Sequence, residues 1–137
     1  MYILFTGAPG SKWSSVAKNI YRSSDIDQSD STSERAYNKD VVRHIGSYFD
    51  PGMEFNNDRD QWDIPFSGSG KRIIKSHTFA HELDKLSTFG YPIVMVYRND
   101  IECLKWWTDA GGFDITYPNY KYFKDQETMW NHIQLEN

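Results

Sequence analysis

The sequence predicts an α/β domain in which a short parallel sheet is flanked by helices. Apolar, β-favouring runs at residues 2–5, 72–75 and 91–97 alternate with segments that favour helices. Strands that alternate with helices pair in parallel, because each connection crosses the sheet before the next strand begins. The 137 residues fit one domain and contain no evident linker, so residues 1–137 are assigned to a single domain.

Helical segments and turn-rich segments divide the rest of the chain. Residues 23–39 are rich in Ser and Asp and predict a solvated loop. Turn formers and scattered aromatics between residues 50 and 71 indicate a long loop that covers a site. Residues 50–70 and 111–122 are the expected walls of a substrate pocket. Helices are expected over residues 14–21, about 39–48, 79–88, 101–109 and 123–135.

Composition and charge restrict the class of partner. Hydrophobic residues make up 39% of the chain and aromatic residues 16%, so large rings must supply much of the core. The formal net charge of −4 gives no general attraction for nucleic acid, and an anion must therefore be held by local donors. No apolar run approaches the roughly 20 residues that span a bilayer. The first residues show no signal-peptide pattern, so a cytoplasmic protein without membrane partners is expected.

Cys103 is the single cysteine of the chain. It excludes an intramolecular disulfide and a multi-cysteine metal site, and it fits a reducing compartment. Its place within an apolar helical pattern favours a packing role over a catalytic one.

Residues 7–15 form the segment in which we expect an anion to bind. A strand, a glycine-rich turn and a helix start direct several backbone N–H groups and the positive end of the helix dipole at one point. A Walker A motif requires Gly-Lys-Ser/Thr, whereas Lys12 here precedes a tryptophan, which weakens a nucleotide-kinase interpretation. The alternative is a tight turn without a ligand. The candidate ligand-binding residues are Pro9, Gly10, Ser11, Lys12, Trp13, Ser14 and Ser15.

A second group of candidate site residues lies at the end of the strand at residues 72–75. Lys75 and His77 follow one another closely at a predicted carboxyl end of the sheet. An imidazole, with an ordinary pKa near about 6.5, can accept a hydroxyl proton at neutral pH, so His77 is a candidate general base. The alternative is that His77 caps the following helix, and the residues alone leave both interpretations open.

The strand at residues 91–97 delivers Arg98 to its carboxyl end. A guanidinium there could hold a phosphate through two parallel hydrogen bonds. The alternative is an ion pair with Asp100 or Glu102. Since the ends of parallel strands meet at one edge, we expect Arg98 to lie with Lys12 and His77 around one anion.

Taken in order, these segments resemble the PAPS-dependent sulfotransferases, which transfer a sulfuryl group from 3′-phosphoadenosine 5′-phosphosulfate (PAPS) to a hydroxyl or amine. The family's loop Pro-Lys-Ser-Gly-Thr-Thr-Trp is similar to residues 9–15, in which Gly and Lys stand in exchanged order. Its Lys-Thr-His segment resembles residues 75–77, and its Arg-Asn-Pro segment resembles residues 98–100. The likeness covers residues 1–22 and 72–107, so the chain resembles a minimal, C-terminally shortened member.

The resemblance implies a three-layer P-loop-like fold with a short parallel β-sheet flanked by helices. It implies PAPS as cosubstrate, PAP as product, no metal, and a small-molecule or glycan acceptor. His77 would be the general base, Lys12 would stabilise the leaving phosphate, Lys75 would assist at the sulfuryl oxygens, and Arg98 would bind the 3′-phosphate. The residues themselves show no Asp or His cluster with metal-ligand spacing. The alternatives are a P-loop nucleotide or small-molecule kinase that uses ATP and Mg²⁺, and an inactive module that binds PAP or a nucleotide.

Overall fold

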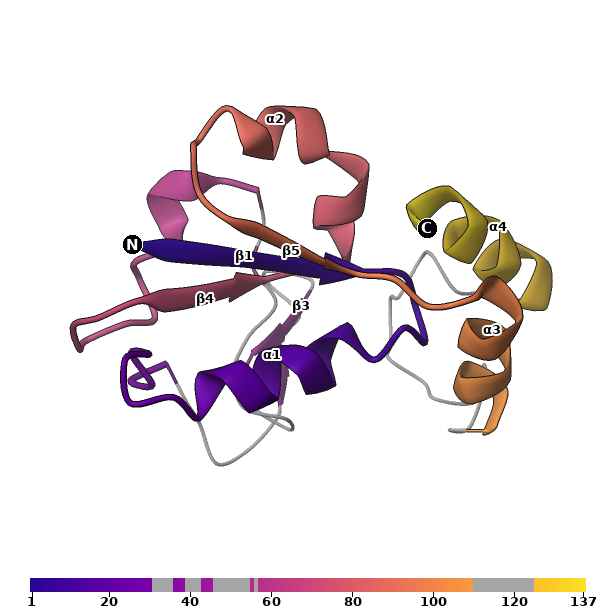
Figure 1. The fold of residues 1–137 in the computed structure, drawn as a ribbon, viewed down its shortest axis with the longest axis horizontal. Helices are drawn as coiled ribbons and strands as arrows, with labels where there is room; N and C mark the ends of the chain where they lie inside the picture. The colour runs from indigo at the N-terminus through magenta and orange to yellow at the C-terminus, as the bar shows by residue number, and fades with distance from the viewer. Residues whose placement is uncertain (31–35, 39–42, 46–54, 56, 110–124) are drawn as a thin grey trace.

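The computed structural model describes residues 1–30, 36–38, 43–45, 55, 57–109 and 125–137. In this part of the chain, a three-stranded parallel sheet combines with four α-helices and a separate two-stranded antiparallel pair (Figure 1). The mixed α/β class and the parallel sheet expected from the sequence are therefore confirmed. No helix among these residues combines the length and the apolar character that crossing a bilayer requires.

The sheet is built around its first strand. Strand β1 (Tyr2–Gly7) lies between β4 (Arg72–Lys75) and β5 (Ile93–Val96) and pairs with both in parallel. Phe5 pairs with Lys75 on one side, and Gly7 pairs with Val96 on the other. The carboxyl ends of all three strands therefore meet at one edge, as in other parallel α/β sheets that bind ligands there.

Helix α1 (Trp13–Tyr21) covers one face of the sheet. Its buried residues recur every four positions, which places them on one side of a helix. Ala17 and Tyr21 pack with Phe5 and Ile73 of the sheet. This apolar contact holds the start of α1 close to the end of β1.

Shorter helical segments cover the opposite face, so that α1 and α2 lie on different sides of the sheet in Figure 1. They are the 3₁₀ turns η1 (Arg59–Gln61) and η2 (His77–His81) and the helix α2 (Leu83–Ser87). The continuous helix expected over residues 79–88 is interrupted at Glu82, whose φ of −129° is not helical. The core on this face contains Tyr2, Leu4, Phe55, Trp62, Ile74, Phe79 and Leu86.

Two helices lie beyond the carboxyl edge of the sheet (Figure 1). Helix α3 (Asp100–Asp109) packs against α4 (Gln126–Glu136) through a small core that contains the free, buried Cys103. The last residue, Asn137, donates from Nδ2 to the Arg98 carbonyl and to Asp100 Oδ1, each over 2.8 Å. The end of α4 is thus tied to the connection between β5 and α3.

Two expectations about residues 23–48 are wrong. The helix expected at about residues 39–48 is contradicted by strand β3 (Arg43–Ile45), which pairs antiparallel with β2 (Ala36–Asn38). A three-residue strand is decided by its cross-strand partner rather than by local propensity, so the pairing was not visible in the residues themselves. The loop expected over residues 23–39 is also not wholly solvated, because Ile26, Asp27 and Asp30 are buried.

Candidate functional site

The loop after β1 makes a tight turn into α1. The Ser11 N–H donates to the Ala8 carbonyl over 3.0 Å, and both Gly10 and Lys12 adopt left-handed conformations, with φ of 78° and 64°. Lys12 is the N-cap of α1, but its side chain makes no capping hydrogen bond. The start of α1 therefore has no side-chain cap from this residue, and the Lys12 ammonium is exposed.

Two glycines allow this loop to pack against the neighbouring elements. A Cβ on Gly10 would lie 2.1 Å from the Cys103 carbonyl oxygen of α3. A Cβ on Gly7 would lie 2.7 Å from both the Ser11 Oγ and the Val96 carbonyl oxygen. Only glycine fits at these positions without a shift of the backbone. The loop is consequently held in contact with the end of β5 and with α3.

Two buried hydroxyl groups lie in and beside the loop. Ser11 is 4% exposed and Thr6, at the end of β1, is fully buried. Neither Ser11 Oγ nor Thr6 Oγ1 has a hydrogen-bond partner among the residues that the structure describes. Buried polar atoms are normally satisfied by protein, water or ligand, because leaving one unpaired costs about 1–3 kcal/mol.

Lys75 lies on the same side of the sheet as α1. The residue is 6% exposed, and its ammonium lies 5.6 Å from the centroid of the Trp13 ring, within the range of a cation–π contact. Because Trp13 is the first residue of α1, a positive charge is held beside the glycine-rich loop. The structure thus brings together Lys75 and the loop, as expected from parallel strand ends.

Burial raises the pKa of Asp30 to about 6, although the hydrogen bond from the Tyr21 hydroxyl and the charge of Lys75 act in the opposite direction. In the unfolded chain Asp30 ionises near about pH 4. Between about pH 4 and pH 6, the folded state therefore keeps a proton on Asp30 that the unfolded chain has lost. The stability that this proton contributes is complete below about pH 4 and is lost as the pH rises through 6.

Asp30→Asn is therefore expected to leave stability unchanged near pH 4 and to raise it by roughly 2–3 kcal/mol at pH 7.5, where an ionised Asp30 is costly. Urea unfolding of both proteins at the two pH values measures the difference. Asp84→Asn on the exposed surface of α2 is the matched control, and it should change stability by less than about 0.5 kcal/mol at either pH. Equal stability of the wild type and Asp30→Asn at pH 7.5 would contradict the raised pKa of Asp30.

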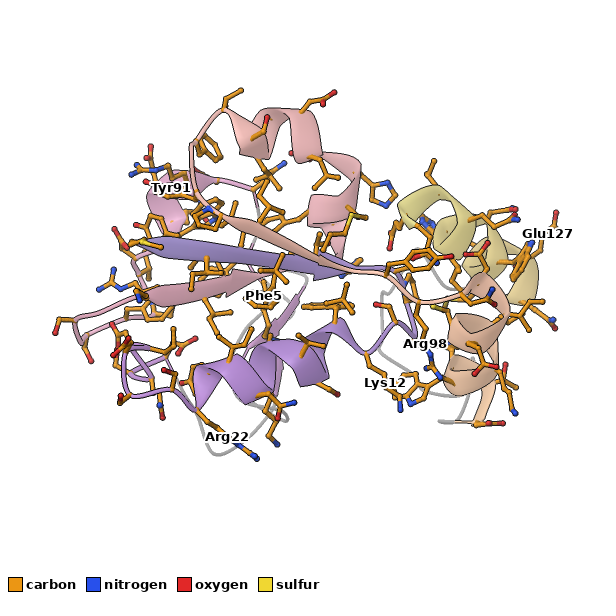
Figure 2. The ribbon with its side chains drawn as sticks, in the orientation of Figure 1. Phe5, Lys12, Arg22, Tyr91, Arg98 and Glu127 are labelled. Atoms are coloured by element: carbon orange, nitrogen blue, oxygen red, sulfur yellow. The ribbon has the colours of Figure 1, made fainter. Side chains whose placement is uncertain are left out.

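Arg98 contacts the loop and also forms an ion pair. Its Nη1 donates to the Gly10 carbonyl over 3.1 Å, and its Nη2 lies 3.3 Å from Glu102 Oε2. The ion pair that the sequence offered as an alternative is therefore present. Since the Glu102 side chain is mostly exposed, this pair is of the weak, solvent-screened kind. Lys12 and Arg98 lie near each other in Figure 2, where the loop meets α3.

His77 is the first residue of η2, on the opposite side of the sheet from α1. The cap of this turn is Ser76, whose Oγ accepts from the Thr78 N–H over 3.3 Å. The alternative role of His77 as a cap is therefore taken by its neighbour. His77 lies near His132 of α4, because its charge contributes, after burial and His81, to the lowered pKa of His132. Lys75 and Arg98 therefore lie beside the loop that contains Lys12, and His77 lies at the start of η2.

A cluster on the η2 side was missed by the sequence analysis, which finds no histidine group with metal-ligand spacing. His81 of η2 lies beside His132 and Glu136 of α4, with one ligand atom of each within 4.8 Å of the others. The spacing of His132 and Glu136, four residues apart, was the available signal, because such residues share one face of a helix. His81 is 51 residues from His132 in the chain, and only the fold joins them.

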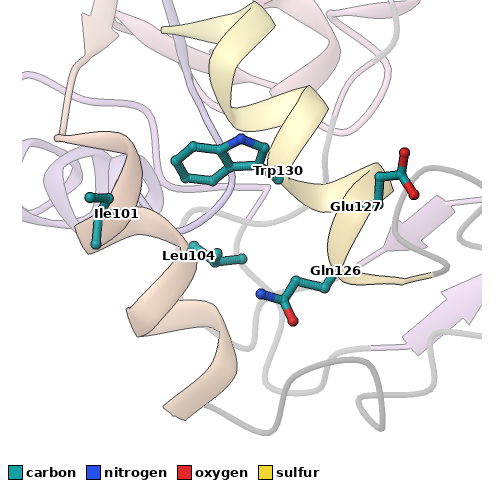
Figure 3. Close-up of a pocket in the computed structure, with 5 residues that line it drawn as sticks. All are labelled: Ile101, Leu104, Gln126, Glu127 and Trp130. Atoms are coloured by element: carbon teal, nitrogen blue, oxygen red, sulfur yellow. The ribbon is translucent and has the colours of Figure 1, made fainter.

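A hollow of about 550 Å³ lies between α3 and α4 (Figure 3). None of its five lining residues carries a positive charge, so it lacks the donors that a phosphate requires. Residues 111–122, expected to line the substrate pocket, lie outside the described residues, as do residues 50–54 and 56. In the described part of the range 50–70, Asp63 contacts Tyr2 and Arg72 at the starts of β1 and β4, away from the carboxyl edge of the sheet. The lining residues are Ile101, Leu104, Gln126, Glu127 and Trp130.

No protein-family model, curated protein or solved structure matches this chain at a significant level.

Proposed function

We propose that this protein is a PAPS-dependent sulfotransferase with a three-layer P-loop-like fold, in which residues 9–15 bind the 5′-phosphosulfate. One observation carries the proposal: the loop, the buried Lys75 and the Arg98 guanidinium meet at the carboxyl edge of a parallel sheet. This arrangement offers a helix start and two cations to one dianionic ligand. The sequence resemblance supplies the identity of that ligand.

In the proposed reaction, an oxygen of the acceptor hydroxyl attacks the sulfur of PAPS. The new S–O bond forms as the S–O bond to the 5′-phosphate breaks, and His77 takes the proton of the acceptor. The electron pair of the broken bond stays on the phosphate of PAP. Lys12 stabilises this growing charge, and Lys75 stabilises the sulfuryl oxygens.

The positions of α1 and η2 on opposite faces of the sheet fit such a reaction. The donor must lie against the loop side, with Lys75, while the acceptor must approach the sulfur from the opposite direction for an in-line displacement. His77 on the η2 side suits the acceptor. Arg98 would hold the 3′-phosphate. Its guanidinium would release the exposed Glu102 carboxylate and bind the phosphate in its place.

The first experiment is calorimetric titration of the protein with PAP in the presence of EDTA. Micromolar or tighter binding is expected without metal, because the protein's own cations neutralise the phosphates. Arg98→Met should weaken this binding about 10- to 100-fold, the effect of losing a charge-assisted contact. Lys105→Met, which removes a cation from an exposed part of α3, is the control and should bind PAP as the wild type does.

The rival functions give different results in the same experiment. ATP binding that requires Mg²⁺, with no binding of PAP, would favour a nucleotide or small-molecule kinase. PAP binding without transfer of sulfate to any phenol, amine or sugar acceptor would favour an inactive binding module. PAP binding that Arg98→Met leaves unchanged would overturn the assignment of the 3′-phosphate contact.

A further inference from the structure

The contact between η2 and α4 contains three side chains with metal-binding chemistry. His81 Nε2 lies 2.6 Å from Glu136 Oε1, and His132 Nδ1 lies 3.8 Å from the same oxygen. The two imidazole rings have their centroids 5.8 Å apart and are nearly perpendicular. Three potential ligand atoms from two separate elements therefore converge on a single point.

The burial of these side chains differs in a way that suits a bound ion. Glu136 is 2% exposed, and a buried carboxylate is costly unless a cation or hydrogen-bond donors compensate its charge. The side chains of His81 and His132 remain 32% and 21% exposed, whereas the Nδ1 atom of His132 is itself buried.

We propose that His81, His132 and Glu136 bind a zinc-class divalent transition-metal ion. Two imidazoles and one carboxylate are a recurring ligand set for Zn²⁺, with the fourth tetrahedral position open to water. Bond lengths of about 2.0–2.2 Å place neighbouring ligand atoms about 3.3 Å apart in a tetrahedron. The 2.6 Å and 3.8 Å separations lie on either side of that value, and the three ligand atoms lie within 4.8 Å of one another, so shifts of these side chains would complete the site.

The ligand types select the kind of metal. Imidazole nitrogen favours zinc, cobalt, nickel, copper and iron, whereas Mg²⁺ and Ca²⁺ prefer sites made of oxygen atoms. The alternative without metal is an ion pair in which His81 and His132 compensate the buried Glu136 carboxylate directly. The two alternatives differ in the role of His132, which contributes a ligand only in the metal site.

A bound ion would hold α4 against η2 at the carboxyl edge of the sheet. His77 begins the same 3₁₀ turn that ends with His81, so the ion would fix the element that carries the proposed general base. This makes the metal a structural support for the site. The inference does not depend on sulfuryl transfer, because the ligand set stands on its own geometry.

The test is titration of the EDTA-treated, dialysed full chain with Zn²⁺ and with Co²⁺, in the absence of PAP. We expect saturable binding of one ion per chain, a higher melting temperature with Zn²⁺, and visible absorption of Co²⁺ with the intensity of tetrahedral coordination. Mg²⁺ should produce none of these changes. Absence of one-to-one Zn²⁺ binding at micromolar protein would overturn the proposal.

Matched variants locate the site. His81→Gln, His132→Gln and Glu136→Gln should each weaken Zn²⁺ binding at least about 100-fold, since loss of a partner that only orients a ligand already costs 10- to 100-fold. Glu127→Gln removes an exposed carboxylate from the first turn of the same helix and should leave Zn²⁺ binding unchanged. Circular dichroism checks that each variant is folded. Because His81 is partly exposed, its substitution should disturb the packing least. Zn²⁺ binding that survives any of the three ligand substitutions unchanged would contradict the site.

Discussion

Gly10→Ala is expected to destabilise the protein by roughly 3 kcal/mol or more and to abolish PAP binding. The φ of 78° at Gly10 is disfavoured for any residue with a Cβ. The added methyl group would also lie 2.1 Å from the Cys103 carbonyl oxygen, and this backbone atom cannot rotate away as a side chain could. The loop and α3 must therefore separate, which costs packing energy in addition to backbone strain. Urea unfolding and calorimetry with PAP measure the two effects.

Gly90→Ala separates backbone strain from the close contact. Gly90 has a similar φ of 70°, but a Cβ there would meet no atom within 4 Å. This variant should lose only about 1 kcal/mol and bind PAP normally. The difference between the two variants then reports the contact between the loop and α3. Equal losses of stability would show that the close approach at Gly10 has no energetic importance.

Local patterns were sufficient to predict the elements around the site. The apolar runs of β1, β4 and β5 are short and β-branched or aromatic, and helical segments separate them, so the parallel sheet followed directly. In a parallel sheet, the residues that follow each strand lie at the same edge. Lys75 and Arg98 do contact the glycine-rich segment at this edge. These predictions succeed because each depends on neighbouring residues and on a topological rule.

The features that were missed depend on residues far apart in the chain. Asp27 is buried in a segment expected to be solvated because Arg72, 45 residues later, forms an ion pair with it over 3.3 Å. Likewise, β3 exists through its pairing with β2, and the Glu136 carboxylate meets His81 only after α4 has packed beyond the sheet. No periodicity within a single segment contains this information, since the partner decides the outcome.

The position of His77 is the part of the predicted site that needed the structure. From the chain alone, His77 was as suitable for capping a helix as for removing a proton. The structure gives the capping role to Ser76 and places His77 at the start of η2, near His132 of α4. The carboxyl edge of the sheet therefore carries Lys75 beside the loop and His77 at the start of η2.

His77→Ala is accordingly expected to lower the rate of sulfuryl transfer by about 10²- to 10⁴-fold, the usual contribution of a general base. PAP binding should remain within about twofold of the wild type, because His77 lies on the acceptor side and leaves the loop, Lys75 and Arg98 intact. The rate is measured as transfer of labelled sulfate from PAPS to a panel of phenol, amine and sugar acceptors. Added imidazole should restore part of the activity, since it can replace the missing base in the space that the side chain leaves. If His77→Ala retained the full rate, or lost PAP binding together with activity, His77 would not be the base and the division of the sheet edge into donor and acceptor sides would be wrong.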